Sequence, residues 1–111
     1  MKFAFFGDFV EEHKRMIEGV GIERGHTHGG PADVIFMMAY ERNIPSVGRA
    51  AEFGNNKKPV LVLRAGQPRW EEERAFFLTR KVKDIVDIPY TEEQAHELFV
   101  ALEIGDTSSL A

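Results

Sequence analysis

A single glutamate, Glu52, stands inside a short, largely apolar segment. Among the side chains of the sequence it is the strongest candidate for a catalytic group. It is expected within a helix over residues 47–53, between buried strands expected over 33–38 and 60–63. Because α/β proteins carry ligands and catalytic groups at the carboxyl edge of a parallel sheet, this carboxylate is a candidate catalytic residue. The alternative is a solvated helix residue paired with Arg49, which would contribute only a few tenths of a kcal/mol.

Three further residues accompany Glu52. Ser46 is expected to cap the amino end of the helix, where backbone N–H groups can also bind an anion. Gly48, one turn before Glu52, leaves room beside the carboxylate for a ligand. Asp33 opens the preceding strand, and from the residues alone it is a strand-start aspartate that accepts a hydrogen bond from a nearby backbone N–H.

Four segments in a fixed order carry a resemblance to a known family. They are Ala-Asp-Val-Ile-Phe at 32–36, Pro-Ser-Val-Gly at 45–48, Glu-Phe-Gly at 52–54 and Lys-Pro-Val-Leu-Val-Leu at 58–63. This series resembles the nucleoside 2-deoxyribosyltransferase superfamily, and especially its nucleotide N-glycosidase branch. The similarity covers residues 33–64.

The resemblance implies an activity and a role for each of these residues. Glu52 would be the nucleophile that attacks the anomeric carbon of a nucleoside and forms a glycosyl-enzyme intermediate, a task that suits a carboxylate. Asp33 would donate a proton to the leaving base, and Ser46, Gly48 and Arg49 would contact the sugar or the phosphate. The resemblance further implies that no metal or organic cofactor is needed and that the protein forms a homodimer or a larger assembly.

The first strand departs from the family's pattern. Relatives often carry an aromatic residue three positions before the glycine that ends this strand, but Ala4 stands there before Gly7. Relatives that bind 5′-monophosphates usually continue with a Ser/Arg/Gly-rich loop, whereas Asp8, Glu11 and Glu12 follow here and would repel a phosphate. We therefore expect Gly7 and Asp8 at the binding site, with an uncharged nucleoside, or no substrate, favoured over a nucleotide.

Three histidines offer a second kind of chemistry. His26 and His28 could place two imidazoles on one side of an extended segment, with His13 as a third zinc ligand. The segment 23–31 is rich in glycine, however, and such spacing arises often by chance. A surface loop without a bound metal is the expectation, and such a loop could still serve as a flap over the site.

The composition excludes several classes of protein. The 111 residues suffice for one domain spanning 1–111, and 43% hydrophobic with 29% charged residues is typical of a globular protein. The net charge of −4 argues against a nucleic-acid partner, which needs clustered Lys and Arg. No apolar run approaches the roughly 18 residues of a membrane span. The absence of cysteine fits a cytoplasmic location.

Apolar runs alternate with helical patterns along the chain. Strands are predicted at 2–6, 33–38, 60–63 and within 82–88, and helices at 9–18, 47–53, 70–80 and after Thr91. Gly19 and Gly21 are expected to end the first helix, Glu71 to Glu73 to form a solvated helix turn, and residues 105–111 a frayed tail. The alternation predicts a small three-layer, doubly wound α/β domain of the flavodoxin or Rossmann-like type, with a mainly parallel sheet of four to five strands.

Two functions from different classes follow. The first is an enzyme that cleaves or exchanges the N-glycosidic bond of a nucleoside, deoxynucleoside or nucleotide, with Glu52 as nucleophile. The second is a module that binds a nucleoside or nucleotide without turnover, which the departures around Ala4 and Asp8 favour. An interaction domain without any small ligand is a third reading.

Overall fold

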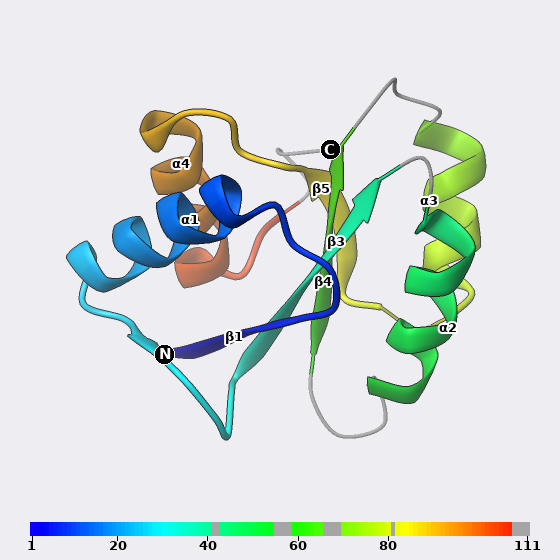
Figure 1. The fold of residues 1–111 in the computed structure, drawn as a ribbon, viewed down its shortest axis with the longest axis horizontal. Helices are drawn as coiled ribbons and strands as arrows, with labels where there is room; N and C mark the ends of the chain where they lie inside the picture. Colours follow the sequence, from blue (N-terminus) through cyan, green and yellow to red (C-terminus); the bar gives the residue numbers. More distant parts are fainter. Residues whose placement is uncertain (41–42, 55–58, 66–69, 81, 108–111) are drawn as a thin grey trace.

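A computed structural model describes residues 1–40, 43–54, 59–65, 70–80 and 82–107 of the chain. A parallel sheet in the order β2-β1-β3-β4-β5 lies between two helical layers (Figure 1). The strands are β1 (Lys2–Phe6), β2 (Thr27–His28), β3 (Val34–Tyr40), β4 (Val60–Ala65) and β5 (Asp84–Asp87), and the helices are α1 (Glu11–Glu23), α2 (Ile44–Gly54), α3 (Trp70–Leu78) and α4 (Glu92–Ile104). The predicted doubly wound α/β fold is confirmed.

The centre of the sheet is buried on both faces, as an all-parallel sheet requires. Successive side chains of a strand point to opposite faces, so each face carries its own apolar core. The core toward α1 and α4 includes Phe36, Leu63 and Phe99. The core toward α2 and α3 includes Val62 and Phe77. Figure 1 shows the two helical layers on either side of the sheet.

The α2/α3 layer covers β1 less completely than it covers β3, β4 and β5. Phe3 and Phe5 point from β1 into or against the core on the α1/α4 side. Their neighbours Lys2, Ala4 and Phe6 point to the opposite face, where Lys2 and Phe6 are exposed and Ala4 is half-buried. One face of β1 therefore remains accessible near the carboxyl edge of the sheet.

Two features of the front half differ from the prediction. Thr27 and His28 form the edge strand β2, paired in parallel with Lys2 and Phe3, where the sequence predicts only a loop. The helix α1 continues through both glycines to Glu23, whereas Gly19 and Gly21 are expected to end it. The reason lies in packing, because Gly21 lies directly against the rings of Phe3 and Phe99.

The start of α2 also differs from the prediction. The helix begins at Ile44, so Ser46 is its third residue and not its cap, and that prediction is wrong. Pro45 stands in the first turn, where the N–H that proline lacks has no partner within the helix in any case. The sequence favours a loop up to this proline, but proline is equally at home just inside a helix.

The segment that follows α4 is ordered as far as residue 107, unlike a frayed tail. Thr91 caps α4, as the sequence predicts, and forms a capping box with Gln94, while Gly105 ends the helix in the left-handed conformation. Beyond it, Thr107 is buried and its hydroxyl donates a hydrogen bond of 2.8 Å to Asp84. The prediction of a frayed tail is therefore wrong as far as residue 107, and the rest of it lies outside the described residues.

The helices are short. The two longest described ones, α1 and α4, have 13 residues each, which corresponds to about 20 Å. Within the described parts of the chain, none has the length and apolar character that crossing a membrane demands.

The packing of Gly21 generates a prediction about stability. A Cβ atom on Gly21 would stand 2.7 Å from ring atoms of Phe3 and Phe99, whereas one on Gly19 would meet nothing within 4 Å. We expect Gly21→Ala to lower the free energy of unfolding by about 1–3 kcal/mol, since overpacking outweighs the helix propensity of alanine. Gly19→Ala is the matched control in the same helix and should raise it by up to about 1 kcal/mol. Urea denaturation checks both, and an equal effect of the two substitutions would contradict this account.

Candidate functional site

The strand order creates a crevice at one place in the sheet. β1 and β3 are neighbours, but the chain passes from β1 into α1 on one face and from β3 into α2 on the other. In the strand order 2-1-3-4-5, ligands bind outside the carboxyl ends of the strands at this reversal. A ligand-binding site is therefore expected at the carboxyl ends of β1 and β3.

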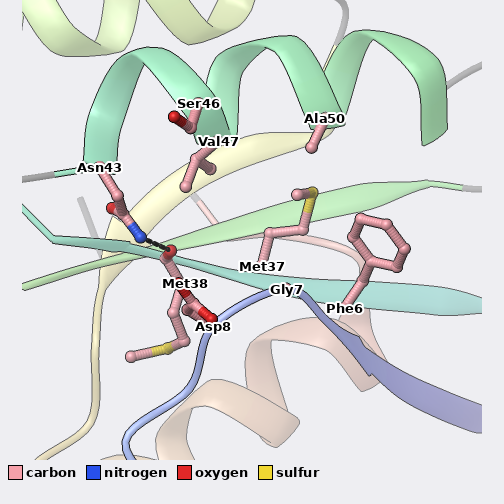
Figure 2. A pocket seen from close by; sticks show the side chains of 9 residues that line it. All are labelled: Phe6, Gly7, Asp8, Met37, Met38, Asn43, Ser46, Val47 and Ala50. Carbon is pink, nitrogen blue, oxygen red and sulfur yellow. Dashed lines mark hydrogen bonds between the residues drawn. The ribbon is translucent and has the colours of Figure 1, made fainter.

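A pocket of about 290 Å³ lies there (Figure 2). The end of β1, the second half of β3 and the first turns of α2 all contribute to its wall. Its volume lies near the lower limit of small-molecule pockets, which span about 300–1,000 Å³. The residues that line it are Phe6, Gly7, Asp8, Met37, Met38, Asn43, Ser46, Val47 and Ala50.

Asn43 holds the wall of the pocket in place. Its side-chain oxygen accepts a hydrogen bond of 2.7 Å from the backbone N–H of Tyr40, and its amide nitrogen lies 3.5 Å from the carbonyl oxygen of Met38. Both ends of the amide thus contact the end of β3, which fixes where α2 begins. We infer that Asn43 shapes the pocket and offers little hydrogen-bonding capacity to a ligand.

Asp8 and Ser46 each carry a polar group that is available to a ligand. Both residues are exposed, and neither the carboxylate nor the hydroxyl makes a hydrogen bond with any described residue. A carboxylate accepts hydrogen bonds only, whereas a hydroxyl both donates and accepts. Among the described lining residues there is one acidic and no basic side chain, so the pocket favours ligands that donate hydrogen bonds and carry no negative charge.

Three of the predicted binding residues come together in this pocket. Gly7, Asp8 and Ser46 all line it, although Gly7 and Ser46 are 39 positions apart along the sequence. Gly7 has a φ of 92°, a conformation that glycine adopts without strain and other residues rarely do. This conformation turns the chain out of β1 and presents Asp8 to the crevice.

Gly48 and Arg49 do not take part in the pocket as the sequence predicts. The space that glycine leaves at position 48 is occupied by α3: an added Cβ would stand 2.5 Å from the ring of Phe76 and 3.1 Å from Nε of Arg80. Gly48 therefore permits close packing of α2 on α3 and does not leave room for a ligand. Arg49 is exposed and forms no ion pair with Glu52.

Glu52 does not line the pocket. It follows Ala50 by two residues, and side chains two apart point about 200° apart around a helix. Because Ala50 faces the pocket, Glu52 faces away from it, and its side chain is exposed. Among the described residues, none forms a hydrogen bond or ion pair with this carboxylate. A catalytic role for Glu52 stays a prediction.

Asp33 also lies away from the pocket. It precedes β3 and accepts a hydrogen bond of 2.8 Å from the backbone N–H of Lys2, at the amino ends of the strands. At about 3.3 Å per residue, the four positions to Met37 place Asp33 roughly 13 Å from the pocket wall. The hydrogen bond confirms the reading of a strand-start aspartate tied to a backbone N–H, and a catalytic role for Asp33 stays a prediction.

The sequence did not reveal several of the lining residues. Phe6 and Met37 read as ordinary strand residues, and nothing in their types marks them as pocket walls. Asn43 was detectable, since asparagine is preferred in turns and just before helices. The segment before Pro45 instead reads as a polar loop, although α2 begins at Ile44.

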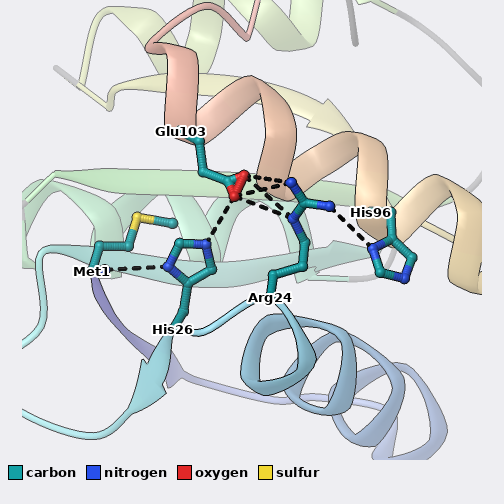
Figure 3. Close-up of polar contacts among 5 residues, drawn as sticks. All are labelled: Met1, Arg24, His26, His96 and Glu103. Carbon is teal, nitrogen blue, oxygen red and sulfur yellow. Dashed lines mark hydrogen bonds and ion pairs between the residues drawn. The ribbon is translucent and has the colours of Figure 1, made fainter.

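The histidines near β2 bind other side chains. The ring of His26 stacks on Phe99 at 5.4 Å between centroids. Figure 3 shows its contact with Glu103, in which Nε2 lies 3.3 Å from a carboxylate oxygen. His28 stacks on another ring and its Nδ1 lies 3.1 Å from Glu18. The two imidazoles thus serve separate contacts in the structure.

His13, the third residue of the possible zinc set, lies on α1 with its ring edge-on to Tyr90 at 5.6 Å. Across the ranges that the structure describes, no three His, Cys, Asp or Glu side chains are grouped as a metal ion would need.

An ion pair beside these histidines links the first and last helices. Arg24, which follows α1, contacts both carboxylate oxygens of Glu103 on α4, the shortest distance being 2.8 Å (Figure 3). The hydrogen bond from Arg24 is the main cause that lowers the pKa of the Glu103 carboxyl, and His26 lowers it further. The same contact raises the pKa of Arg24.

A second charged cluster lies under α3, next to the pocket along the sheet. Arg64 of β4 is buried and pairs with Glu73, which is buried too, although the sequence predicts a solvated turn there. Asp87 of β5 stands beside Arg64 in the register of the two paired strands. Burial raises the pKa of Asp87, and the charge of Arg64 partly opposes that rise. The need to neutralise Arg64 explains why a glutamate of the acidic turn faces inward.

Comparison with known proteins adds no family to this picture. No model of a known family matches the chain, and no curated protein matches it either.

The pKa of Glu103 predicts how stability depends on pH. Because the pKa is lower in the folded state, the pair stabilises the fold fully above the unfolded value of about 4.3, and the contribution is lost as the pH falls through the folded value. Glu103→Gln should therefore lower the free energy of unfolding at pH 7, and the difference from wild type should vanish in acid.

Urea denaturation between pH 7 and pH 3 measures this difference. Glu97→Gln, on the same helix, is the control, because Glu97 is exposed and has no ion pair with a described residue. A difference between wild type and Glu103→Gln that stays constant down to pH 3 would show that the ion pair is not its source.

Proposed function

We propose that the protein binds an uncharged nucleoside or deoxynucleoside in the pocket at the carboxyl ends of β1 and β3. The observation that carries the proposal is the pair of uncommitted polar groups, the carboxylate of Asp8 and the hydroxyl of Ser46, at the reversal point of the sheet. Sugar hydroxyls donate hydrogen bonds, and a carboxylate is the strongest acceptor that a protein offers them. The resemblance of residues 33–64 to nucleoside 2-deoxyribosyltransferases supports the same class of ligand.

The charge of Asp8 argues against a nucleotide. A single negative charge of a phosphate, 4 Å from the carboxylate, is repelled by about 1 kcal/mol in water. In the less polar surroundings near a protein surface the repulsion is about 4 kcal/mol. The amino end of α2 attracts an anion by only about 0.3–1 kcal/mol. The repulsion outweighs this attraction, and more so for a phosphate that carries close to two charges.

Binding without turnover accounts for the placement of the carboxylates better than glycosidase chemistry does. A nucleophile must reach the anomeric carbon of the bound sugar, but Glu52 faces away from this pocket and Asp33 lies toward the other edge of the sheet. Cleavage or transfer at the N-glycosidic bond through Glu52 is a separate proposal that rests on the resemblance alone.

Asp8→Asn tests the binding proposal. Loss of a charged hydrogen-bond acceptor should weaken nucleoside binding about 10- to 100-fold. The same substitution removes the repulsion of a phosphate, so the preference for a nucleoside over its 5′-monophosphate should shrink. Titration calorimetry with adenosine, uridine and their monophosphates measures both effects.

Glu12→Gln is the charge-matched control for Asp8→Asn. Glu12 carries the same charge four residues away, is exposed and does not line the pocket. It should leave nucleoside affinity within about twofold, since exposed charges interact weakly in salt. If Asp8→Asn and Glu12→Gln behave alike, Asp8 does not contact the ligand.

An assay of free-base release tests the catalytic alternative. We expect no base to be released from bound nucleosides by the wild type, because no described lining residue except Asp8 carries a carboxylate. Release by the wild type and none by Glu52→Gln would instead establish Glu52 as the nucleophile. Release that Asp8→Asn abolishes and Glu52→Gln preserves would assign the chemistry to Asp8.

A further inference from the structure

We propose that Phe6 is the platform on which the aromatic base of the ligand stacks. The nucleoside would then bind with its base over Phe6 and its sugar toward Asp8 and Ser46. This inference rests on the proposed function and adds the orientation of the ligand and the residue that selects an aromatic ring.

The ring of Phe6 is largely exposed and does not take part in the aromatic core. Phe6 is 57% exposed, and no described aromatic ring packs against it. By contrast, Phe3, Phe5, Phe36 and Phe99 contact one another through a series of edge-on and tilted ring pairs. One exposed phenylalanine is common on protein surfaces, so exposure alone would mean little. Phe6 differs because it also lines the pocket.

The neighbours of Phe6 complete an apolar end of the pocket. In the register of β1 and β3, Phe6 stands beside Met37, which is only 3% exposed. Neighbouring strands lie about 4.8 Å apart, so the thioether and the ring are adjacent on the same face of the sheet. Figure 2 shows Phe6, Met37 and Ala50 toward one end of the pocket.

The polar side chains of the pocket gather at its other end. Figure 2 places Asp8, Asn43 and Ser46 there, away from the ring of Phe6. A ligand that fills both ends needs a flat apolar part and a part rich in hydrogen-bond donors. A nucleoside meets this description, and its base offers a face that stacks on an aromatic ring irrespective of the base. The site should therefore discriminate weakly among bases and strongly against sugars that carry none.

Phe6→Leu tests the inference, because leucine keeps the apolar character and removes the ring. Titration calorimetry should show adenosine and uridine binding about 5- to 150-fold more weakly than to the wild type. Phe6→Tyr should restore most of the affinity. Methyl β-D-ribofuranoside, which has no base, should bind weakly to the wild type and be unaffected by the leucine. Tyr90→Leu is the control: Tyr90 is 60% exposed and does not line the pocket.

The outcomes separate the inference from the proposed function. If nucleosides bind and Phe6→Leu matches the wild type, the platform is wrong while the proposed function stands. If no nucleoside binds the wild type, both fail. If Phe6→Leu changes self-association in sedimentation and leaves nucleoside affinity unaltered, the exposed ring belongs to a contact between two copies of the chain, and the inference is overturned. Melting temperatures of all variants verify that they are folded.

Discussion

The pocket depends on a topological constraint: β1 and β3 lie side by side, yet the chain leaves them toward opposite faces of the sheet. No helix can cover the ends of both strands, so a crevice remains between the two exits. In this chain the crevice is given its chemistry by Gly7, which turns the chain out of β1, and by Asn43, which fixes the start of α2. Asp8 and Ser46 are brought to one place because each follows one of these two turns.

Close packing within the helical layers decides how much of β1 stays open. Without a side chain at Gly48, the ring of Phe76 and the guanidinium of Arg80 approach α2 directly, and the two helices share the area above the central strands. Within this layer α2 packs on β3 and α3 packs on β5, which leaves β1 largely open on this face. On the other face Gly21 brings α1 down onto Phe3, which is completely buried. Phe6 points to the face of the α2/α3 layer, and that layer leaves it 57% exposed.

The sequence predicted an element correctly where a strong local pattern, such as an apolar run or a helix cap, determines it. The buried strands were predicted from their apolar runs, and the start of α4 from Thr91. Prediction failed where a contact distant in sequence decided the outcome. Gly21 reads as a helix breaker until Phe3 and Phe99 are placed against it, and Glu73 reads as solvated until Arg64 needs a partner. The edge strand β2 has two residues and no apolar character of its own. It forms by pairing with β1, which is distant in sequence, so no local pattern marks it as a strand.

The same distinction explains which part of the candidate site was predictable. Gly7 and Asp8 directly follow a strand, so the polarity of a parallel sheet places them at its carboxyl edge without further information. Glu52 belongs to a helix that starts at this edge and runs back, and a residue six positions beyond Ser46 is carried about 9 Å away from it. Asp33 precedes its strand and lies at the opposite edge for the same reason. A sugar held at Asp8 would therefore present its anomeric carbon far from both carboxylates. Glycosidase chemistry through Glu52 requires a different binding position from the one that this pocket offers.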